Sequence, residues 1–438
     1  MKVCFLTLGC KVNQTESEAL AQYAAKKGYE VVKETEQPDA VIINTCTVTA
    51  TGSSKSRKLI HRIVKDHPSS VIVVMGCYSQ ISPGEVAKIE GVDLVVGTQD
   101  RLSIFDYLKQ VGAGEITGQV VGKNKDTLNT VKVFTPALEY EELPLIVNES
   151  RTRAMLKIQD GCSQFCSYCI VPYARGPSRS RKPENIINET KALLNSGYKE
   201  IVLTGIHIGA YGQDLDNNIN LAGLISELVQ IDALNRLRLG SIEPLEFTDE
   251  LLAIIAATKV VCHHFHIPLQ SGHNRILTEM KRPYTTEYYA DLLQKIRDRL
   301  PEAALAADVM AGFPGETEHE HQETLKFIEK CEFAGIHAFP YSRRPGTPAA
   351  DMPNQVPNRT KSARVKDIIR IGQKTKQKYS QKFVGREVEV LVEKVFEDGT
   401  AQGHTRNYLE LKLPAQKGKE PWKPGQLVRC ILKEEYLI

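Results

Sequence analysis

Three cysteines on one short loop constrain the fold of this chain more than any other feature. Cys162, Cys166 and Cys169 have the spacing C-x3-C-x2-C and directly follow an apolar, strand-like stretch at 154–158. Three thiolates can hold three irons of a four-iron, four-sulfur cluster, and the fourth iron is then free to bind another molecule. A structural zinc ion is the alternative, but it needs a fourth ligand with its own spacing, and none lies nearby in the sequence. We therefore predict an iron–sulfur cluster on a loop that follows a strand.

Length and composition indicate a globular protein of several domains. The chain has 438 residues, enough for two or three domains, with 42% hydrophobic and 25% charged residues. It contains no apolar run of the roughly 18 residues needed to span a membrane, and its first ten residues do not resemble a signal peptide. We expect a cytoplasmic protein with no membrane contact, whose ten cysteines serve metal binding or catalysis rather than disulfides.

Residues 1–140 have the pattern of an open parallel α/β domain. Continuous apolar runs at 3–8, 40–44 and 71–75 suit strands that are covered on both faces. A helix is predicted over 15–28, ending at Gly28. The alternation of strands and helical stretches predicts a parallel sheet between layers of helices.

Each of these three strands is followed by a cysteine. Cys10, Cys46 and Cys77 come directly after the first, second and third apolar run. A single cysteine at such a place is as readily a small buried hydrophobic residue. The carboxyl ends of parallel strands, however, gather at one edge of the sheet and form its ligand crevice. Three cysteines that converge there indicate a second cluster with an open iron.

Residues 150–345 repeat βα units, which predicts a full or partial TIM-like barrel. The expected strands are 154–158, 200–204, 236–239, 264–267, 304–309 and 335–339, separated by helices such as 183–197 and 285–300. Active sites of such barrels lie at the carboxyl ends of the strands.

Four loops follow these strands, at 204–212, 241–244, 268–272 and 311–318. The last is not a phosphate-binding P-loop, because it lacks the G-K-[ST] ending. His263, His264 and His266 resemble a metal cluster, but neighbours on a strand face opposite ways, so ordinary packing is the favoured interpretation.

The C-terminal third begins with a proline-rich connector at 342–358. The following basic linker segment, 359–382, carries nine Lys or Arg and one Asp, a net charge of 9 − 1 = +8. This is either a solvated face or, given the imbalance, a contact for a polyanion. Residues 383–438 alternate like short strands with glycine-rich turns, which predicts a small β-barrel of a kind common among RNA-binding modules.

A second basic patch adjoins the cluster loop. It consists of Arg175, Arg179, Arg181 and Lys182. Two interpretations stay equally open: a solvated loop, or a set of cations that holds a phosphate or carboxylate near the chemistry.

On these residues the chain resembles the radical S-adenosylmethionine (SAM) methylthiotransferase family along essentially its whole length. The resemblance lies in the three spaced N-terminal cysteines, the central C-x3-C-x2-C barrel and the C-terminal TRAM-type barrel, in this order. The opening TLGCKVNQ at 7–14 is similar to the enzymes that act on threonylcarbamoyladenosine in tRNA, mainly through Lys11, Val12 and Gln14. Relatives that act on isopentenyladenosine in tRNA, or on an aspartate of a ribosomal protein, have a different motif around the first cysteine. These two substrates remain the alternatives.

The resemblance implies two 4Fe–4S clusters, SAM and a methylthio transfer to C2 of N6-threonylcarbamoyladenosine next to the anticodon. Cys162, Cys166 and Cys169 would hold the SAM-cleaving cluster, and Cys10, Cys46 and Cys77 the auxiliary cluster that supplies sulfur. Expected SAM contacts, by barrel position, are Thr204, Gly205, His207, Ser241, Glu243, Gln270 and Asp308. Tyr168 would either stack on adenine or pack on the cluster. Implied partners are a tRNA anticodon stem-loop and an electron donor such as flavodoxin or ferredoxin, with the enzyme as a monomer.

A non-catalytic iron–sulfur protein, either an electron carrier or a redox sensor, is the rival class. Carriers normally supply four protein ligands to each cluster. Both sites here supply three, which favours the enzyme. The remaining cysteines, Cys4, Cys262, Cys331 and Cys430, match neither site and are expected to be core or incidental.

Overall fold

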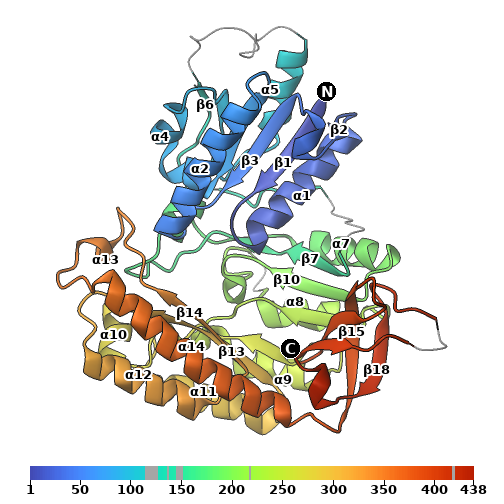
Figure 1. Cartoon of the computed structure of the whole chain (residues 1–438), viewed down its shortest axis with the longest axis vertical. Coiled ribbons are helices and arrows are strands. Elements are labelled where there is room, and N and C mark those ends of the chain that lie inside the picture. The colour runs from blue at the N-terminus through green and yellow to red at the C-terminus, as the bar shows by residue number, and fades with distance from the viewer. Residues whose placement is uncertain (114–126, 136–137, 145–150, 217–218, 417–419) are drawn as a thin grey trace.

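The computed structural model of the chain describes residues 1–113, 127–135, 138–144, 151–216, 219–416 and 420–438. It has an N-terminal sheet domain, a central barrel and a C-terminal sheet packed beside the barrel (Figure 1). The predicted boundary between residues 140 and 150 lies partly outside the described residues.

The N-terminal domain is a parallel six-stranded sheet, as predicted. Its strands, in spatial order, are β2 (Glu30–Val31), β1 (Lys2–Thr7), β3 (Ala40–Thr45), β4 (Val71–Gly76), β5 (Leu94–Val95) and β6 (Leu128–Asn129). Its helices are α1 (Lys11–Lys26), α2 (Ala50–Asp66), α3 (Cys77–Ile81), α4 (Pro83–Ala87) and α5 (Ser103–Gly112). A short 3-10 turn, η1 (Glu34–Glu36), precedes β3.

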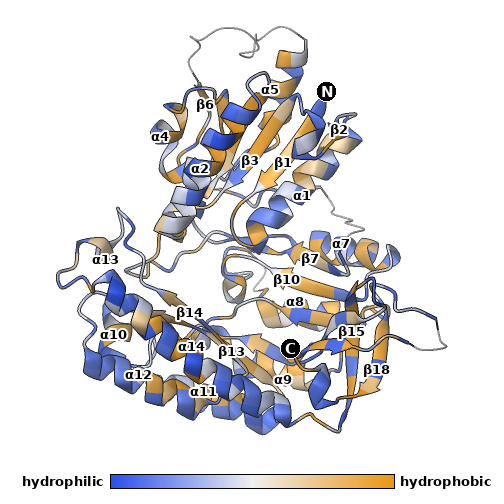
Figure 2. Cartoon of the chain, viewed as in Figure 1, coloured by the Kyte–Doolittle hydropathy of each residue, from blue (hydrophilic) through white to orange (hydrophobic). Residues whose placement is uncertain are grey.

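Every residue of β3 and β4 is buried, because helices cover both faces of the sheet. On one face Ile42 packs with Leu20 of α1 and Ile104 of α5. On the other face Val41 packs with Ile60 of α2. The apolar strands stand out between the more polar helices in Figure 2.

Helix α1 begins four residues earlier than predicted. Its first residue is Lys11, directly after Cys10, whereas the sequence pattern indicated Thr15. The apolar pattern did not indicate the first turn of α1, because most of its residues are polar. Asn13, for example, is buried through hydrogen bonds to Asn44 and not through apolar packing.

The central domain is the predicted partial (βα)6 barrel of six parallel strands. They are β7 (Arg153–Lys157), β10 (Glu200–Thr204), β11 (Arg236–Leu239), β12 (His264–His266), β13 (Ala304–Ala311) and β14 (Gly335–Pro340). Pairing runs β7-β10-β11 and β12-β13-β14, and a bridge between Leu237 and Val261 joins the halves. Within the described residues no pairing closes β14 onto β7.

Helices surround the barrel strands on their outer side. They are α7 (Pro183–Asn195), α8 (Leu221–Leu228), α9 (Asp249–Ala257), α10 (Asn274–Glu279), α11 (Thr286–Arg299) and α12 (Glu318–Cys331). Shorter elements are α6 (Val171–Arg175), α13 (Pro348–Asp351), the 3-10 turns η2 (Ile208–Ala210) and η3 (Pro244–Glu246), and the two-stranded β8 (Gln159–Asp160) with β9 (Arg179–Ser180).

Alternation along the barrel strands separates an apolar outer face from a polar inner face. The outward residues belong to the main core, among them Leu203, Leu237 and Phe265. The positions between them include a set of charged and imidazole side chains, namely Glu200, Arg236, Arg238, His264, His266 and Asp308. Of these, Glu200 pairs with Arg236 and Arg238, so part of this polar interior is satisfied within the protein.

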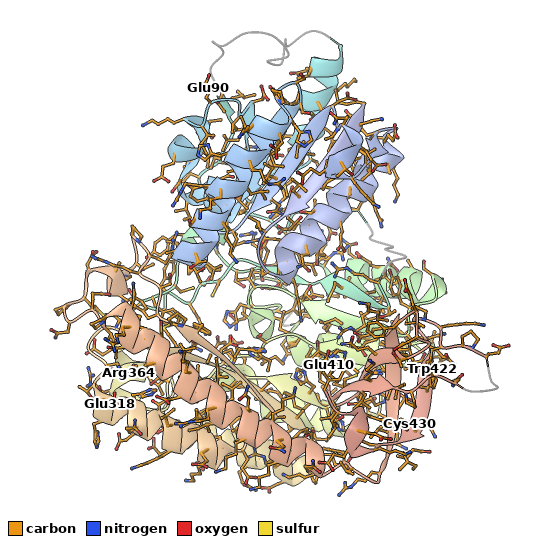
Figure 3. All side chains as sticks on the ribbon, viewed as in Figure 1. Glu90, Glu318, Arg364, Glu410, Trp422 and Cys430 are labelled. Atoms are coloured by element: carbon orange, nitrogen blue, oxygen red, sulfur yellow. The ribbon has the colours of Figure 1, made fainter. Side chains whose placement is uncertain are left out.

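The basic segment 359–382 forms one helix, α14 (Asn358–Gln381), which packs against β14 and α12. Many of its charges are paired within the protein. Arg364 is buried and bonds Glu316 at 2.7 Å and Glu318 at 3.3 Å, the latter pair labelled in Figure 3. Lys374 pairs with Glu329 at 2.6 Å. The free basic charge of this segment is therefore much smaller than its sequence indicates.

The C-terminal residues form a four-stranded antiparallel sheet that covers the amino ends of the barrel strands. Its order is β17 (Glu410–Leu413), β16 (Ala401–Thr405), β15 (Glu387–Val395) and β18 (Leu427–Ile431), followed by the 3-10 turn η4 (Glu434–Tyr436). Arg238 of β11 donates to the carbonyls of Thr405 and Arg406. The C-terminal sheet leaves the opposite ends of the strands, the carboxyl ends, uncovered, and active sites of such barrels lie there.

Tyr408 is the centre of this contact. Its ring stacks on His264 of β12 at 4.5 Å, and the guanidinium of Arg238 lies 4.7 Å from its centroid. Its hydroxyl accepts a hydrogen bond from Arg153 of β7 at 3.2 Å.

We expect Tyr408→Ala to loosen the C-terminal sheet from the barrel, at a cost of about 2–4 kcal/mol for the lost aromatic packing. Limited proteolysis should release residues 383–438 faster than in the wild type. Tyr288→Ala, on the 41% exposed tyrosine of α11, is the matched control and should change little. Equal cleavage rates in the two variants would contradict this role of Tyr408.

No helix among the described residues is both long enough and apolar enough to cross a membrane.

Candidate active site

The loop with Cys162, Cys166 and Cys169 lies between β8 and α6, near the carboxyl end of β7. It is closed at its base, because the N–H of Cys162 donates to the carbonyl of Gly176 at 3.0 Å. Backbone N–H groups also point at its sulfurs: Gln164 donates to Cys162 and Val171 to Cys169, both at 3.4 Å. Such hydrogen bonds stabilise thiolates that bind metal.

The sulfurs are spread too widely for a single metal ion. Among the described residues, only His266, Asp308 and His337 bring three ligand atoms within 4.8 Å of one another. Zinc–sulfur bonds of about 2.3 Å would hold all ligand sulfurs within about 4.6 Å. Neither cysteine triplet is that compact, so the zinc alternative does not fit this loop.

Arg282 is a contact that the sequence did not indicate. It follows α10 and donates to the sulfur of Cys166 at 3.2 Å, and it also pairs with Glu243. Burial alone would raise the pKa of Cys166, and the charge of Arg282 opposes that rise. The predicted SAM contact Glu243 is thus engaged with Arg282 beside the cluster loop. Arg282 and Cys166 are 116 positions apart, so no spacing in the sequence marks this pair.

His207 connects the cluster loop to the next strand. Its Nδ1 lies 3.6 Å from the sulfur of Cys162, and its Nε2 lies 2.6 Å from Glu246. Burial would lower the pKa of His207, but the hydrogen bonds to Cys162 and Glu246 outweigh it and raise that pKa to about 10. His207 therefore presents a positive charge to Cys162.

Two predicted SAM positions carry buried polar atoms that have no hydrogen-bond partner among the described residues. These atoms are Oγ1 of Thr204, at the end of β10, and Oε1 of Gln270, after β12. Gln270 also has a left-handed backbone, with φ of 65°. Buried polar atoms are normally hydrogen-bonded, so such atoms fit a site that a polar ligand completes.

Gly205 is explained by packing alone. A Cβ there would lie 2.9 Å from the carbonyl oxygen of Gln159. The side chain of Gln159 accepts the N–H of His207 at 2.7 Å and donates to the carbonyl of Gly161 at 2.8 Å. Gln159, which the sequence did not single out, therefore ties the cluster loop to the loop at 204–212.

Ser241, His266, Asp308 and His337 form a hydrogen-bonded chain on the inner face of the barrel. Ser241 bonds His266 at 2.6 Å, and Asp308 lies 2.9 Å from His266 and 3.2 Å from His337. Although burial would raise the pKa of Asp308, the two imidazoles lower it well below its usual range. Of the three predicted packing histidines, His264 does stack on Tyr408, whereas His266 belongs to this polar chain.

The three N-terminal cysteines gather at one edge of the sheet. Cys10 caps α1, Cys46 follows β3, and Cys77 is the first residue of α3 after β4. These strands are neighbours, so their carboxyl ends meet. Burial is the main cause that raises the pKa of Cys77 to about 11, and the nearby thiols of Cys10 and Cys46 add to it. Only a cation or a metal would keep such buried thiols ionised.

Arg175 joins the two cysteine sites. It ends α6, directly after the SAM-type loop, and α6 packs against α3 of the N-terminal domain. Its guanidinium is fully buried, donates to Asn13 at 3.2 Å and pairs with Glu16 at 2.5 Å. Although burial would lower the pKa of Arg175, the adjacent thiol of Cys77 and the carboxyl of Glu16 raise it.

Glu16 and Asp160 anchor a buried network between the two domains. Glu16, on α1, accepts from Arg101 at 2.9 Å, from Lys157 at 2.8 Å and from Arg175. Asp160 shares Lys157 at 2.7 Å and also lies near Arg179. Burial would raise the pKa of Glu16, but the surrounding cations lower it to about 2.

The basic patch beside the cluster loop is therefore not a solvated loop. Arg175 and Arg179 are buried and belong to the network around Asp160. Arg181 is buried and pairs with Glu142 at 2.8 Å and Glu189 at 2.5 Å. These three guanidinium groups have partners inside the protein, so of the predicted patch only Lys182 is exposed.

The remaining predicted residues have local roles. Tyr168 packs against the small core that contains Ile276 and Met280, which favours packing over stacking on adenine. Cys4, Cys262 and Cys331 are buried and Cys430 is partly buried, all as free thiols.

Comparison with known proteins identifies the family. The model of an uncharacterised protein family, UPF0004, matches residues 2–97, and the radical SAM superfamily matches 156–328. Threonylcarbamoyladenosine tRNA methylthiotransferase MtaB from Bacillus subtilis is 42% identical over 99% of this chain and 97% of its own length. The chain belongs to the radical SAM methylthiotransferase family.

Further relatives support this membership. A methylthiotransferase of the same name from Aquifex aeolicus is 36% identical over 99% of this chain and 100% of its own. A tRNA-2-methylthio-N(6)-dimethylallyladenosine synthase from Pelotomaculum thermopropionicum is 37% identical over 93% and 90%. As a radical SAM methylthiotransferase, the protein is a transferase that uses SAM and two 4Fe–4S clusters, and not an electron carrier.

Solved structures share the fold of this methylthiotransferase. The radical SAM methyltransferase TsrM from Kitasatospora setae has a TM-score of 0.58 at 17% identity, covering 80% of this chain and 74% of its own. The cobalamin-dependent SAM radical enzyme OxsB has a TM-score of 0.54 at 13% identity, covering 86% and 56%. These likenesses show the pairing of an α/β domain with a radical SAM barrel and nothing of the substrate.

Proposed function

We propose that this methylthiotransferase adds a methylthio group to C2 of N6-threonylcarbamoyladenosine, next to the anticodon of tRNA. The observation that carries this proposal is the 42% identity, over nearly the whole of both chains, to a relative named for that nucleoside. Two relatives named for dimethylallyladenosine are less identical, at 37% over 93% of this chain and 33% over 99% of it, so that nucleoside is the second candidate.

Cys162, Cys166 and Cys169 would hold the SAM-binding cluster, and Cys10, Cys46 and Cys77 the auxiliary cluster. When bound, the clusters and SAM supply one-electron cleavage of SAM, hydrogen abstraction from an unactivated carbon, and the sulfur and methyl that are transferred. The domains follow from these roles: residues 1–140 for the auxiliary site, 150–345 for SAM, and 383–438 as a TRAM-type module for RNA.

The protein's own residues would bind, orient and exclude water. His207 and Arg282 place positive charge beside Cys162 and Cys166, which favours the ionised sulfurs that bind metal. The orphaned polar atoms of Thr204 and Gln270 would bind SAM, together with Ser241 and Asp308. Arg175 would fix the auxiliary site relative to the SAM site, because the short helix α6 leads from Cys169 to it.

A tRNA anticodon stem-loop would be the partner. The side chains of Arg359, Lys366 and Lys382, in the α14 region, make no hydrogen bond or ion pair among the described residues, which leaves them able to contact phosphates. A low-potential donor such as flavodoxin or ferredoxin would supply electrons. The enzyme would act as a monomer in the cytoplasm.

Mass spectrometry of tRNA nucleosides from cells with and without this gene tests the proposal. We expect the deletion to remove only the methylthio form of threonylcarbamoyladenosine and to leave its precursor. Loss of the methylthio form of isopentenyladenosine would instead support the second candidate. An unchanged nucleoside profile would exclude both.

A further inference from the structure

Lys11 is the exposed cation next to the auxiliary cysteines. It follows Cys10 directly and is the first residue of α1. Its ammonium makes no hydrogen bond or ion pair with any described residue. The other cations near these cysteines are engaged: Arg175 pairs with Glu16, and Arg344 donates to Thr47 at 2.7 Å. Lys11 therefore keeps its positive charge available to a ligand.

The charge of Lys11 reaches the inner face of the barrel. Burial is the main cause that lowers the pKa of His264 on β12, and Lys11 contributes to that shift. The hydrogen bond to Asp308 raises the pKa of His337 on β14, and Lys11 opposes that rise. The geometry agrees, because α1 begins at Lys11 and contacts β7 of the barrel, and Asn13, two residues further on, accepts a hydrogen bond from Arg175 after the cluster loop. The start of α1 therefore lies between the auxiliary cysteines and the barrel.

His337, as an imidazolium paired with Asp308, offers a second donor on the inner face of the barrel. Its side chain is 73% exposed, and Nδ1 lies 3.2 Å from Asp308. The other ring nitrogen, Nε2, has no protein partner among the described residues. Asp308 is shared with His266 as well, so it pairs with imidazoles and leaves Lys11 without a counter-charge.

The chemistry of the proposed substrate places an anion near this point. The threonyl group of N6-threonylcarbamoyladenosine ends in a carboxylate. Its ureido N–H can donate to N1 of the adenine, which closes a six-membered hydrogen-bonded ring. The carboxylate then lies on the edge of the base that carries C2, the atom that must approach the auxiliary site.

We propose that Lys11, supported by His337, binds the carboxylate of the threonylcarbamoyl group and so selects this nucleoside over one with a neutral substituent. Charge-assisted hydrogen bonds from an ammonium to a carboxylate are among the stronger polar contacts in proteins. Because no carboxylate of the described residues pairs with Lys11, the substrate's own would do so. This inference rests on the proposed function and identifies the residue that recognises the threonylcarbamoyl substituent.

Equilibrium binding of short RNA hairpins to the cluster-loaded protein, without reductant, tests this directly. Three probes are compared: a stem-loop with threonylcarbamoyladenosine, the same RNA as its neutral threonyl methyl ester, and one with isopentenyladenosine. Lys11→Gln should weaken binding of the first probe about tenfold or more and leave the other two unchanged. Lys11→Arg should retain most of the preference.

Lys26→Gln, an exposed lysine at the far end of α1, is the matched control and should bind all probes like the wild type. Equal weakening of all probes by Lys11→Gln would mean a phosphate contact and would overturn the inference, as would no weakening at all. If the wild-type enzyme methylthiolates the isopentenyl probe and not the threonylcarbamoyl probe, the proposed function fails. If it methylthiolates the threonylcarbamoyl probe while Lys11→Gln shows no selective loss, only the role of Lys11 fails.

Discussion

Replacement of Cys10, Cys46 and Cys77 together with alanine should abolish methylthiolation and leave SAM cleavage to 5′-deoxyadenosine intact. The three residues meet at the ends of β1, β3 and β4, on a different domain from the SAM-type loop. Their loss therefore removes the proposed sulfur-supplying site while Cys162, Cys166 and Cys169 keep their contacts. Iron content should fall from about eight to about four atoms per chain, as expected for the loss of one four-iron cluster.

The reciprocal variant, with alanine at Cys162, Cys166 and Cys169, is the matched comparison. It should contain a similar amount of iron but form neither 5′-deoxyadenosine nor product. Cys430→Ala removes a partly buried thiol of the C-terminal sheet and should leave iron and activity unchanged. Methylthiolation that survives the loss of Cys10, Cys46 and Cys77 would exclude the auxiliary role.

Glu16→Gln should destabilise the interface between the two domains by about 3–5 kcal/mol. Glu16 is fully buried and receives hydrogen bonds from Arg101, Lys157 and Arg175. Its neutralisation removes one of the two buried carboxylates, Glu16 and Asp160, that compensate these cations. The midpoint of urea unfolding, measured on the cluster-free protein, should fall clearly. Because Arg175 loses its shorter carboxylate contact and keeps only the one to Asp160 at 3.3 Å, reconstitution of the auxiliary site should bind less iron.

Glu18→Gln, two residues along the same helix, is the control for this change. Glu18 pairs with Arg151 near the surface, where ion pairs contribute at most about 1 kcal/mol. Equal unfolding midpoints for Glu16→Gln and Glu18→Gln would show that the buried network does not hold the domains together.

The same network makes the cluster-free protein sensitive to acid. The pKa of Glu16 is lowered from 4.5 to about 2 in the folded state. Its stabilising contribution is therefore complete above pH 4.5 and is lost as the pH falls toward 2. Circular dichroism across this range should show the wild type losing stability, with a weaker pH dependence in Glu16→Gln. Identical pH profiles would assign the acid sensitivity to other carboxyl groups.

Local features of the sequence were sufficient to predict where both cysteine sites lie. Cys10, Cys46 and Cys77 each follow a continuous apolar run, and parallel strands necessarily bring such positions to one edge. Hydrophobic periodicity likewise predicted the six barrel strands, because burial on the outer face imposes it on neighbouring residues. By contrast, the start of α1 at Lys11 was missed, because polar partners bury its first turn.

The sequence by itself determined the two cysteine sites and the α/β architecture, since strand burial and ligand spacing act over a few residues. Only the tertiary structure decided which charges meet. Arg175 and Glu16 are 159 positions apart, and Arg282 and Cys166 are 116 apart. In the sequence, the basic residues of α14 form a run with a large net positive charge. In the structure, Glu316 and Glu329 pair with two of them, Arg364 and Lys374. The position of a charged residue in the sequence does not indicate which residue it will pair with. Its role therefore depends on which strands and helices the fold brings together.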